Sequence, residues 1–89
     1  MLLDGLISIA ELAVAEDLAP GVVAWCAAAH RSPEPGQQLA LDKLGLSPVL
    51  DLGMRLGEGS GALTALPLLQ SAALLMRETA LLADLTPAQ

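Results

Sequence analysis

The residues best suited to chemistry lie in one glycine-rich stretch, Arg55–Ala62. It places a carboxylate, Glu58, between Gly57 and Gly59, with Ser60 directly after them. Glycine has no Cβ, so it adopts positive φ easily and lets the backbone come close to a ligand. A carboxylate on such a turn is a candidate general base, which would take a proton from a bound substrate. The alternative is a helix boundary at which Glu58 is solvated and has no chemical role.

Four further motifs precede this stretch. They are, in order, Asp4-Gly5-Leu6-Ile7-Ser8, Ala19-Pro20-Gly21-Val22-Val23, His30-Arg31-Ser32-Pro33-Glu34-Pro35-Gly36 and Leu44-Gly45-Leu46-Ser47-Pro48-Val49-Leu50-Asp51-Leu52. With the Arg55–Ala62 turn, they resemble the C-terminal part of the nicotinate-nucleotide–dimethylbenzimidazole phosphoribosyltransferase family, which makes the lower-ligand nucleotide of cobalamin. The resemblance runs from about Leu3 to about Ala73 and covers only the last quarter or so of the family's usual length.

The resemblance implies a role for each motif. Glu58 matches the family's catalytic base, which would accept the N–H proton of the benzimidazole while its other ring nitrogen attacks C1′ of nicotinate mononucleotide. Leu56 and Met54 would supply part of an apolar slot for the flat base. The residues that the resemblance places at the substrates are Asp4, Gly5, His30, Ser32, Leu56, Gly57, Gly59 and Ser60.

Several of these residues also have a purely structural interpretation. Asp4 could equally cap the helix that follows it, because Asp is a favoured N-cap residue. His30 could be a hydrogen-bonded structural histidine. Arg55 is expected to pair with Asp51, one helical turn back, rather than to bind phosphate. No second histidine or carboxylate cluster indicates a metal site, and no cofactor is expected.

The chain also departs from the family pattern. Leu6, Ala29 and Leu81-Leu82 stand where the family has aromatic or polar residues. The family's nucleotide-binding segment and most of its parallel sheet would lie upstream of Met1, so the isolated chain is expected to be inactive. It would need a chain that supplies the missing part, and the alternative is a non-catalytic helical interaction module or a truncated remnant of the enzyme.

The composition limits the possible partners. Of the 89 residues, 54% are apolar, and the mean hydropathy is +0.60, which is more apolar surface than a small monomer hides easily. We therefore expect a homo-oligomer or a complex with a nucleotide-binding chain. A net charge of −6 argues against nucleic acid as a partner.

The location is expected to be cytoplasmic. The single cysteine, Cys26, excludes an internal disulfide and suggests a reducing compartment, and no basic segment precedes an apolar run as in a signal peptide. Residues 59–76 carry no charge, but they include a proline and several polar side chains. We interpret them as a buried helix of a soluble protein, not as a membrane span.

The fold class is predicted to be mainly α: residues 1–89 form one helical C-terminal segment of an α/β enzyme. At most one or two short strands are expected, near Leu2–Asp4 and before His30. Local signals predict helices at 6–18, in the first part of 22–29, at 37–44 after a proline-containing first turn, at 47–54, and from Ser60 or Thr64 to about 84.

The last helix should bury one apolar face. Pro67 favours a start near Thr64, because a proline in the first turn leaves no hydrogen bond unmade. The face expected to be buried comprises Leu68, Ala72, Leu75, Met76, Thr79, Leu82 and Ala83. Leu74 and Leu81 lie one heptad apart on the polar side, where they could meet a partner or be isolated exposed leucines.

Overall fold

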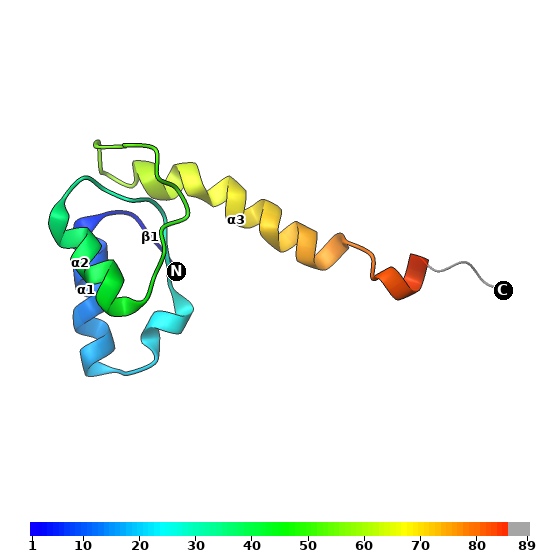
Figure 1. Ribbon diagram of the computed structural model, residues 1–89, viewed down its shortest axis with the longest axis horizontal. Helices are drawn as coiled ribbons and strands as arrows, with labels where there is room; N and C mark the ends of the chain where they lie inside the picture. The colour runs from blue at the N-terminus through cyan, green and yellow to red at the C-terminus, as the bar shows by residue number, and fades with distance from the viewer. Residues whose placement is uncertain (86–89) are drawn as a thin grey trace.

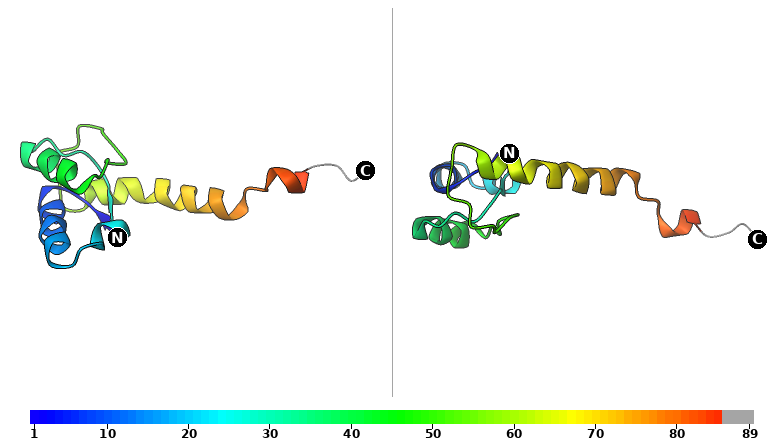
Figure 2. Two further views of the ribbon diagram at one scale, coloured as in Figure 1. Left: turned by 60° about the horizontal axis from the view of Figure 1, so that its bottom comes forward. Right: turned by 90° about the horizontal axis from the view of Figure 1, so that it is seen from above.

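A small folded body and one long helix that projects from it make up the molecule (Figure 1). The computed structural model describes residues 1–85, and its extents along the principal axes are 58 × 30 × 17 Å. Both views in Figure 2 show the same projecting helix. The elements along the chain are β1 (Leu2–Leu3), α1 (Leu6–Leu18), the 3₁₀-helix η1 (Val22–Trp25), β2 (Ala27–Ala28), α2 (Pro35–Leu44), α3 (Ser60–Glu78) and the 3₁₀-helix η2 (Leu82–Leu85). The predicted class, mainly helical with two short strands, is confirmed.

The two strands pair in parallel, with Leu2 opposite Ala27 and Leu3 opposite Ala28. Their predicted positions, near Leu2–Asp4 and before His30, are therefore correct. Because a parallel pair needs a crossover, α1 and η1 lie between the two strands in the chain.

The predicted helix at 47–54 is wrong, because this segment pairs with the sheet. The backbone N–H groups of Val49 and Leu50 donate to the carbonyls of Ala28 and Ala29, both at 2.9 Å, and Leu50 forms a parallel bridge with His30. The serine and proline before Val49 are a local helix-start signal. Here the hydrogen bonds offered by β2 and the residues after it decide the conformation instead.

Local signals do end the first two long helices correctly. α1 stops at Leu18 before Ala19-Pro20, and the Glu16 carboxylate then accepts N–H bonds from Gly21 and Val23, both at 2.8 Å. α2 begins with a proline at its first position and ends before Gly45, whose φ of 69° only glycine adopts at little cost.

The buried core is small and lies where α1 and α2 pack together against the strands. Its members are Leu3, Ile9, Leu12, Ala28 and Leu41. This core holds β1, β2, α1 and α2 in fixed relative positions, and the loops that join them carry four of the nine predicted site residues: Asp4, Gly5, His30 and Ser32.

α3 differs from its prediction at both ends. It begins at Ser60 and continues through Pro67, and it stops at Glu78 rather than near residue 84. Pro67 has no N–H to donate to Leu63, but Leu63 is exposed, so water can bond its free carbonyl.

The predicted buried face of α3 is also wrong. Only Gly61 and Ala65 of this helix are buried, while Leu75 is 66% and Met76 is 89% exposed. The reason is geometric: beyond its first turns α3 extends past the body, so no part of the described chain covers it (Figure 1). Leu74 and Leu81 are both exposed, but Leu81 follows the end of α3, so the two do not share one helix face. Within residues 1–85, no helix is both long and apolar enough to cross a bilayer.

Candidate functional site

A cleft of about 430 Å³ lies between the start of α1, the loop after β2 and the segment before α3. Seven of the nine predicted site residues line it: Asp4, Gly5, His30, Ser32, Leu56, Gly57 and Glu58. Gly59 and Ser60 are not among the lining residues, but they complete the turn that carries Glu58. The fold thus brings three distant segments of the chain to one place.

The glycine-glutamate-glycine segment forms a tight left-handed turn. The Ser60 N–H donates to the Gly57 carbonyl at 3.0 Å, and φ is 57° at Glu58 and 83° at Gly59. Positive φ at both central positions is the pattern of a type I′ turn. Glu58 is the one described residue other than glycine with positive φ, a conformation that costs an L-residue about 1–2 kcal/mol. The remaining structure must therefore hold this turn in place.

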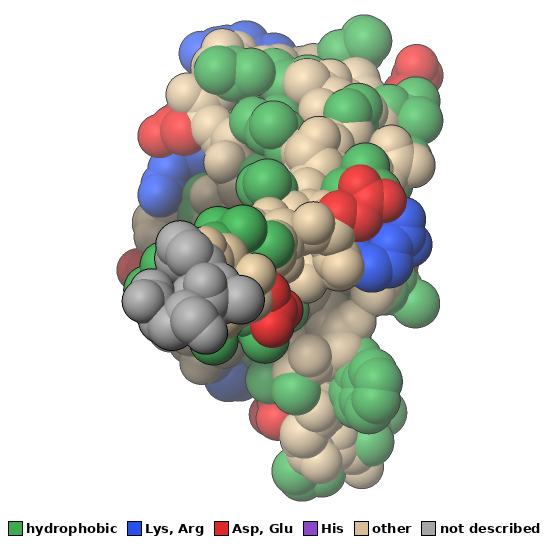
Figure 3. Space-filling view, turned by 90° about the vertical axis from the view of Figure 1, so that its right-hand side faces the viewer, with side chains coloured by type: hydrophobic (Ala, Val, Ile, Leu, Met, Phe, Trp, Pro, Cys, Tyr) green, Lys and Arg blue, Asp and Glu red, His purple; other side chains and the backbone are tan. Residues whose placement is uncertain are grey.

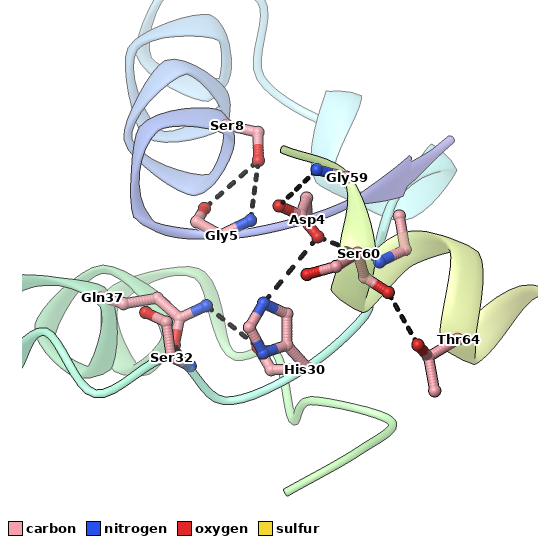
Figure 4. Close-up of polar contacts among 10 residues, drawn as sticks. Asp4, Gly5, Ser8, His30, Ser32, Gln37, Gly59, Ser60 and Thr64 are labelled. Atoms are coloured by element: carbon pink, nitrogen blue, oxygen red, sulfur yellow. Dashed lines mark hydrogen bonds and ion pairs between the residues drawn. The ribbon is translucent and has the colours of Figure 1, made fainter. Parts of the chain in front are cut away.

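Asp4 connects this turn to the strand β1. Its Oδ2 accepts the Gly59 N–H at 3.1 Å and its Oδ1 accepts the Ala62 N–H at 2.9 Å (Figure 4). The N–H groups at the first turn of a helix have no partner inside the helix, and a carboxylate is favoured there by the helix dipole. Asp4 therefore caps α3, whereas α1, the helix next to it in sequence, has Gly5 as its N-cap, which is hydrogen-bonded to the Ser8 hydroxyl.

His30 lies behind the turn as a buried ring. It is 2% exposed, and its Nε2 lies 3.8 Å from Asp4 Oδ1. Neither ring nitrogen has a hydrogen-bond partner among the described residues. The ring packs directly on Gly61, where an added Cβ would come within 1.9 Å of His30 Cδ2. Only glycine fits at this point of contact.

The loop that carries His30 and Ser32 is held by a side chain that sequence analysis did not single out. Gln37, fully buried near the start of α2, donates from Nε2 to the His30 carbonyl at 2.9 Å. Its Oε1 accepts the Ser32 N–H at 2.7 Å. The sequence did hold one signal for this role: Gln37 is an uncharged polar residue in the first turn of a helix that directly follows a predicted site loop.

The charge of the cleft is mainly negative. Four carboxylates line it (Asp4, Glu11, Glu34 and Glu58) together with one cation, Arg55. The Ser32 hydroxyl and the backbone N–H of Glu34 itself hold the pKa of Glu34 below its usual range, so this side chain is charged near neutral pH. Such a cleft suits a ligand that offers N–H donors or positive charge.

Arg55 does not pair with Asp51, so that prediction is wrong. Asp51 accepts from Arg31 Nε at 3.2 Å instead. The expected pairing assumed a helix at 47–54, which would have put the two side chains one turn apart. The segment is not helical, and in it Arg55 lines the cleft.

Chemically, the cleft can accept a proton and hold a flat apolar group. Glu58 lies beside Leu56 and Met54 on its wall, so a carboxylate and apolar side chains face the same space. Among residues 1–85, no group of three or more His, Cys, Asp or Glu side chains could hold a metal ion.

Comparison with known proteins agrees with the motifs. The protein-family model described as "Phosphoribosyltransferase" matches residues 1–85. The chain belongs to the nicotinate-nucleotide–dimethylbenzimidazole phosphoribosyltransferase family. It is 52% identical over 84 residues to the enzyme of that name from Corynebacterium efficiens, and 54% identical over 84 residues to the one from Mycobacterium ulcerans.

A solved structure shares the fold. The crystal structure of the enzyme of this name from Thermus thermophilus matches 98% of this chain at 40% identity, with a TM-score of 0.84. These matches cover only 23% and 24% of the two curated relatives and 27% of the solved chain. The chain therefore spans about a quarter of the length of the proteins that it resembles.

Proposed function

We propose that this chain supplies the base-carrying part of a site that transfers phosphoribose from nicotinate mononucleotide to dimethylbenzimidazole. The observation that carries the proposal is Glu58, which lines a cleft beside apolar Leu56 and Met54. The names of the relatives support the reaction class, since each is called a nicotinate-nucleotide–dimethylbenzimidazole phosphoribosyltransferase. The segment spans residues 1–89, and the rest of the site belongs to the part of the family's length that this chain does not include.

The proposed step needs one base and one electrophile. One ring nitrogen of the benzimidazole attacks C1′ of the ribose and forms the new C–N bond. The bond from C1′ to the nicotinate nitrogen breaks, and nicotinate leaves with that electron pair. The proton on the other ring nitrogen of the benzimidazole passes to the carboxylate of Glu58, which restores a neutral ring. Gly5, His30 and Ser32 would line the side on which the nucleotide lies.

The charges in the cleft indicate which part of the substrate this chain is poorly suited to bind. A phosphate is bound best by cations and free backbone N–H groups. The cleft offers one cation, Arg55, against four carboxylates. At the start of α3 the N–H groups of Gly59 and Ala62 are already occupied by Asp4. We therefore assign phosphate recognition to residues outside this chain, and we expect little or no transfer by the 89-residue chain alone.

The test is a transferase assay with the complete assembly, in which a chain that supplies the remaining length is present. Glu58→Gln keeps the size of the side chain but removes the base, so kcat should fall by about 10²–10⁴ with nucleotide affinity nearly unchanged. Glu11→Gln is the matched control, because it removes the same charge from the cleft wall. Its effect should stay below about tenfold if proton transfer, rather than total cleft charge, is what Glu58 provides.

Two results would refute this proposal. Unchanged turnover in Glu58→Gln would remove Glu58 from the mechanism. Full activity of the isolated 89-residue chain would show that its own residues build the whole site.

We also propose that the chain works in an assembly, through its exposed apolar surface. Leu68, Leu75 and Met76 on α3 are at least half exposed. Figure 3, which faces the α3 end, shows hydrophobic side chains spread among charged ones. A second hollow of about 520 Å³ is lined mainly by apolar residues, with Trp25 and Cys26 among them. The same surface would serve the alternative function, a helical interaction module without catalysis.

A further inference from the structure

Among residues 1–85, Asp4 is the side chain whose hydrogen bonds tie the turn of Glu58 to the sheet. We propose that Asp4 is a positioning residue for Glu58, and that it acts on the turn and not on the substrate. The catalytic part of this inference rests on the proposed function, while the structural part stands on the hydrogen bonds alone. It also changes the role expected for Asp4, from substrate contact to support of the base.

Both oxygens of the Asp4 carboxylate are engaged by backbone. Oδ2 accepts from Gly59, the residue directly after Glu58, and Oδ1 accepts from Ala62, in the first turn of α3. The two donors lie 55 and 58 positions away in the chain, so these bonds fix the turn relative to β1. A hydrogen bond to a charged acceptor is stronger than one between neutral groups, so a carboxylate suits this task.

The turn has few other constraints. Its closing bond runs from the Ser60 N–H to the Gly57 carbonyl, inside the turn itself, and cannot orient the turn relative to the cleft. Glu58 is held at a φ of 57°, a conformation that persists only where the surroundings impose it. The hydrogen bonds to Asp4 provide such a constraint from outside the turn.

The buried ring of His30 supports Asp4 from behind. It lies between the carboxylate, 3.8 Å from Oδ1, and the backbone of Gly61. The backbone of His30 is in turn fixed by the Gln37 amide and by the bridge to Leu50. Asp4 is only 20% exposed at its side chain, so it is shielded from water while it holds the two N–H groups.

The structural part can be tested in the unmutated chain. A scalar coupling across each hydrogen bond, from the amide nitrogens of Gly59 and Ala62 to the Asp4 carboxylate carbon, should be detectable by NMR. Absence of both couplings overturns the proposal without any substitution. In Asp4→Asn, which has one acceptor oxygen instead of two, exchange protection of these two amides should fall by about tenfold. Asp17→Asn is the charge-matched control, because Asp17 is exposed and its ion pair within residues 1–85 is the one with Lys43, far from the turn.

The catalytic part is tested by a double-mutant cycle in the complete assembly. Asp4→Asn should lower kcat by about 10–10² and leave KM for the nucleotide nearly unchanged. In a Glu58→Gln background the same substitution should not lower kcat any further, because the base that Asp4 positions is already lost. Equal losses in both backgrounds, or a loss confined to KM, would overturn the positioning role.

These results separate this inference from the proposed function. If the unmutated assembly transfers no phosphoribose, the proposed function fails, and the NMR couplings alone decide whether Asp4 holds the turn. If Glu58→Gln lowers kcat but Asp4→Asn does not, the proposed function stands and the positioning role fails.

Discussion

Gly61 provides the most direct test of how the site is packed, through the substitution Gly61→Ala. The new Cβ would lie 1.9 Å from His30 Cδ2, 2.5 Å from Nε2 and 2.6 Å from Cγ. An ordinary contact starts near 3.4 Å, so the ring or α3 must move by about 1.5 Å (3.4 − 1.9). The ring is fully enclosed, and the backbone next to it is bound to Leu50 by the Arg31 N–H at 2.8 Å.

Overpacking a buried site costs about 1–3 kcal/mol, and a clash of this depth belongs at or above the upper end. Alanine regains up to about 1 kcal/mol of helix propensity over glycine. The net loss should therefore be about 2–3 kcal/mol in the free energy of unfolding, which in a domain of this size lowers Tm by about 10 °C or more. Urea unfolding followed by circular dichroism at the helix band measures it.

Two further variants show whether the ring is the cause. Gly36→Ala is the control, since its new Cβ meets only the flexible end of Leu6 at 3.3 Å. The Gly36→Ala substitution should leave the free energy of unfolding nearly unchanged. In a His30→Ala background the space is open, so Gly61→Ala should become neutral or stabilising. A Gly61→Ala variant that is as stable as wild type beside His30, or that loses equal stability without it, would show that the His30 ring is not the cause.

Two more predictions concern pH and assembly. The N–H bonds from Gly21 and Val23 hold the pKa of the Glu16 carboxylate below its ordinary value, so the stabilisation that they give is full at neutral pH and is lost as the pH falls through the lowered pKa. The urea midpoints of wild type and Glu16→Gln should therefore differ at pH 7 and converge in acid, and a constant difference would contradict this. Leu75→Lys should lower the association constant measured by sedimentation by about tenfold or more. Gln70→Lys, on the opposite side of α3, should not lower it, and equal effects of the two variants would contradict a role for the apolar face.

Short-range signals predicted a large part of this fold. The end of α1 before Pro20 and the end of α2 at Gly45 were placed correctly, because each depends on the φ and ψ that a few neighbouring residues allow. The turn at Gly57-Glu58-Gly59 was predicted for the same reason. Most of the predicted site residues also share one cleft, but that grouping came from the family resemblance and not from local physics.

Where hydrogen bonds to distant residues compete, the local signals failed. Residues 47–54 carry a good helix start, yet Val49 and Leu50 donate to the carbonyls of Ala28 and Ala29, and Leu50 forms an isolated bridge with His30. The length and exposure of α3 could not be predicted from its periodicity, because burial depends on what lies beside a helix. A pattern of leucines shows that a face can be covered, but not that this chain covers it.

The sequence by itself determined which residues could do chemistry, because a carboxylate between two glycines is a local property. Only the tertiary structure decided how that carboxylate is held. Asp4 caps α3 across 58 positions, and Gly61 is required because the ring of His30 lies against it. Such contacts join residues that are far apart in the chain, and no spacing rule along the sequence specifies them. They form only when the core has packed and brought the strand, the loop and the helix together.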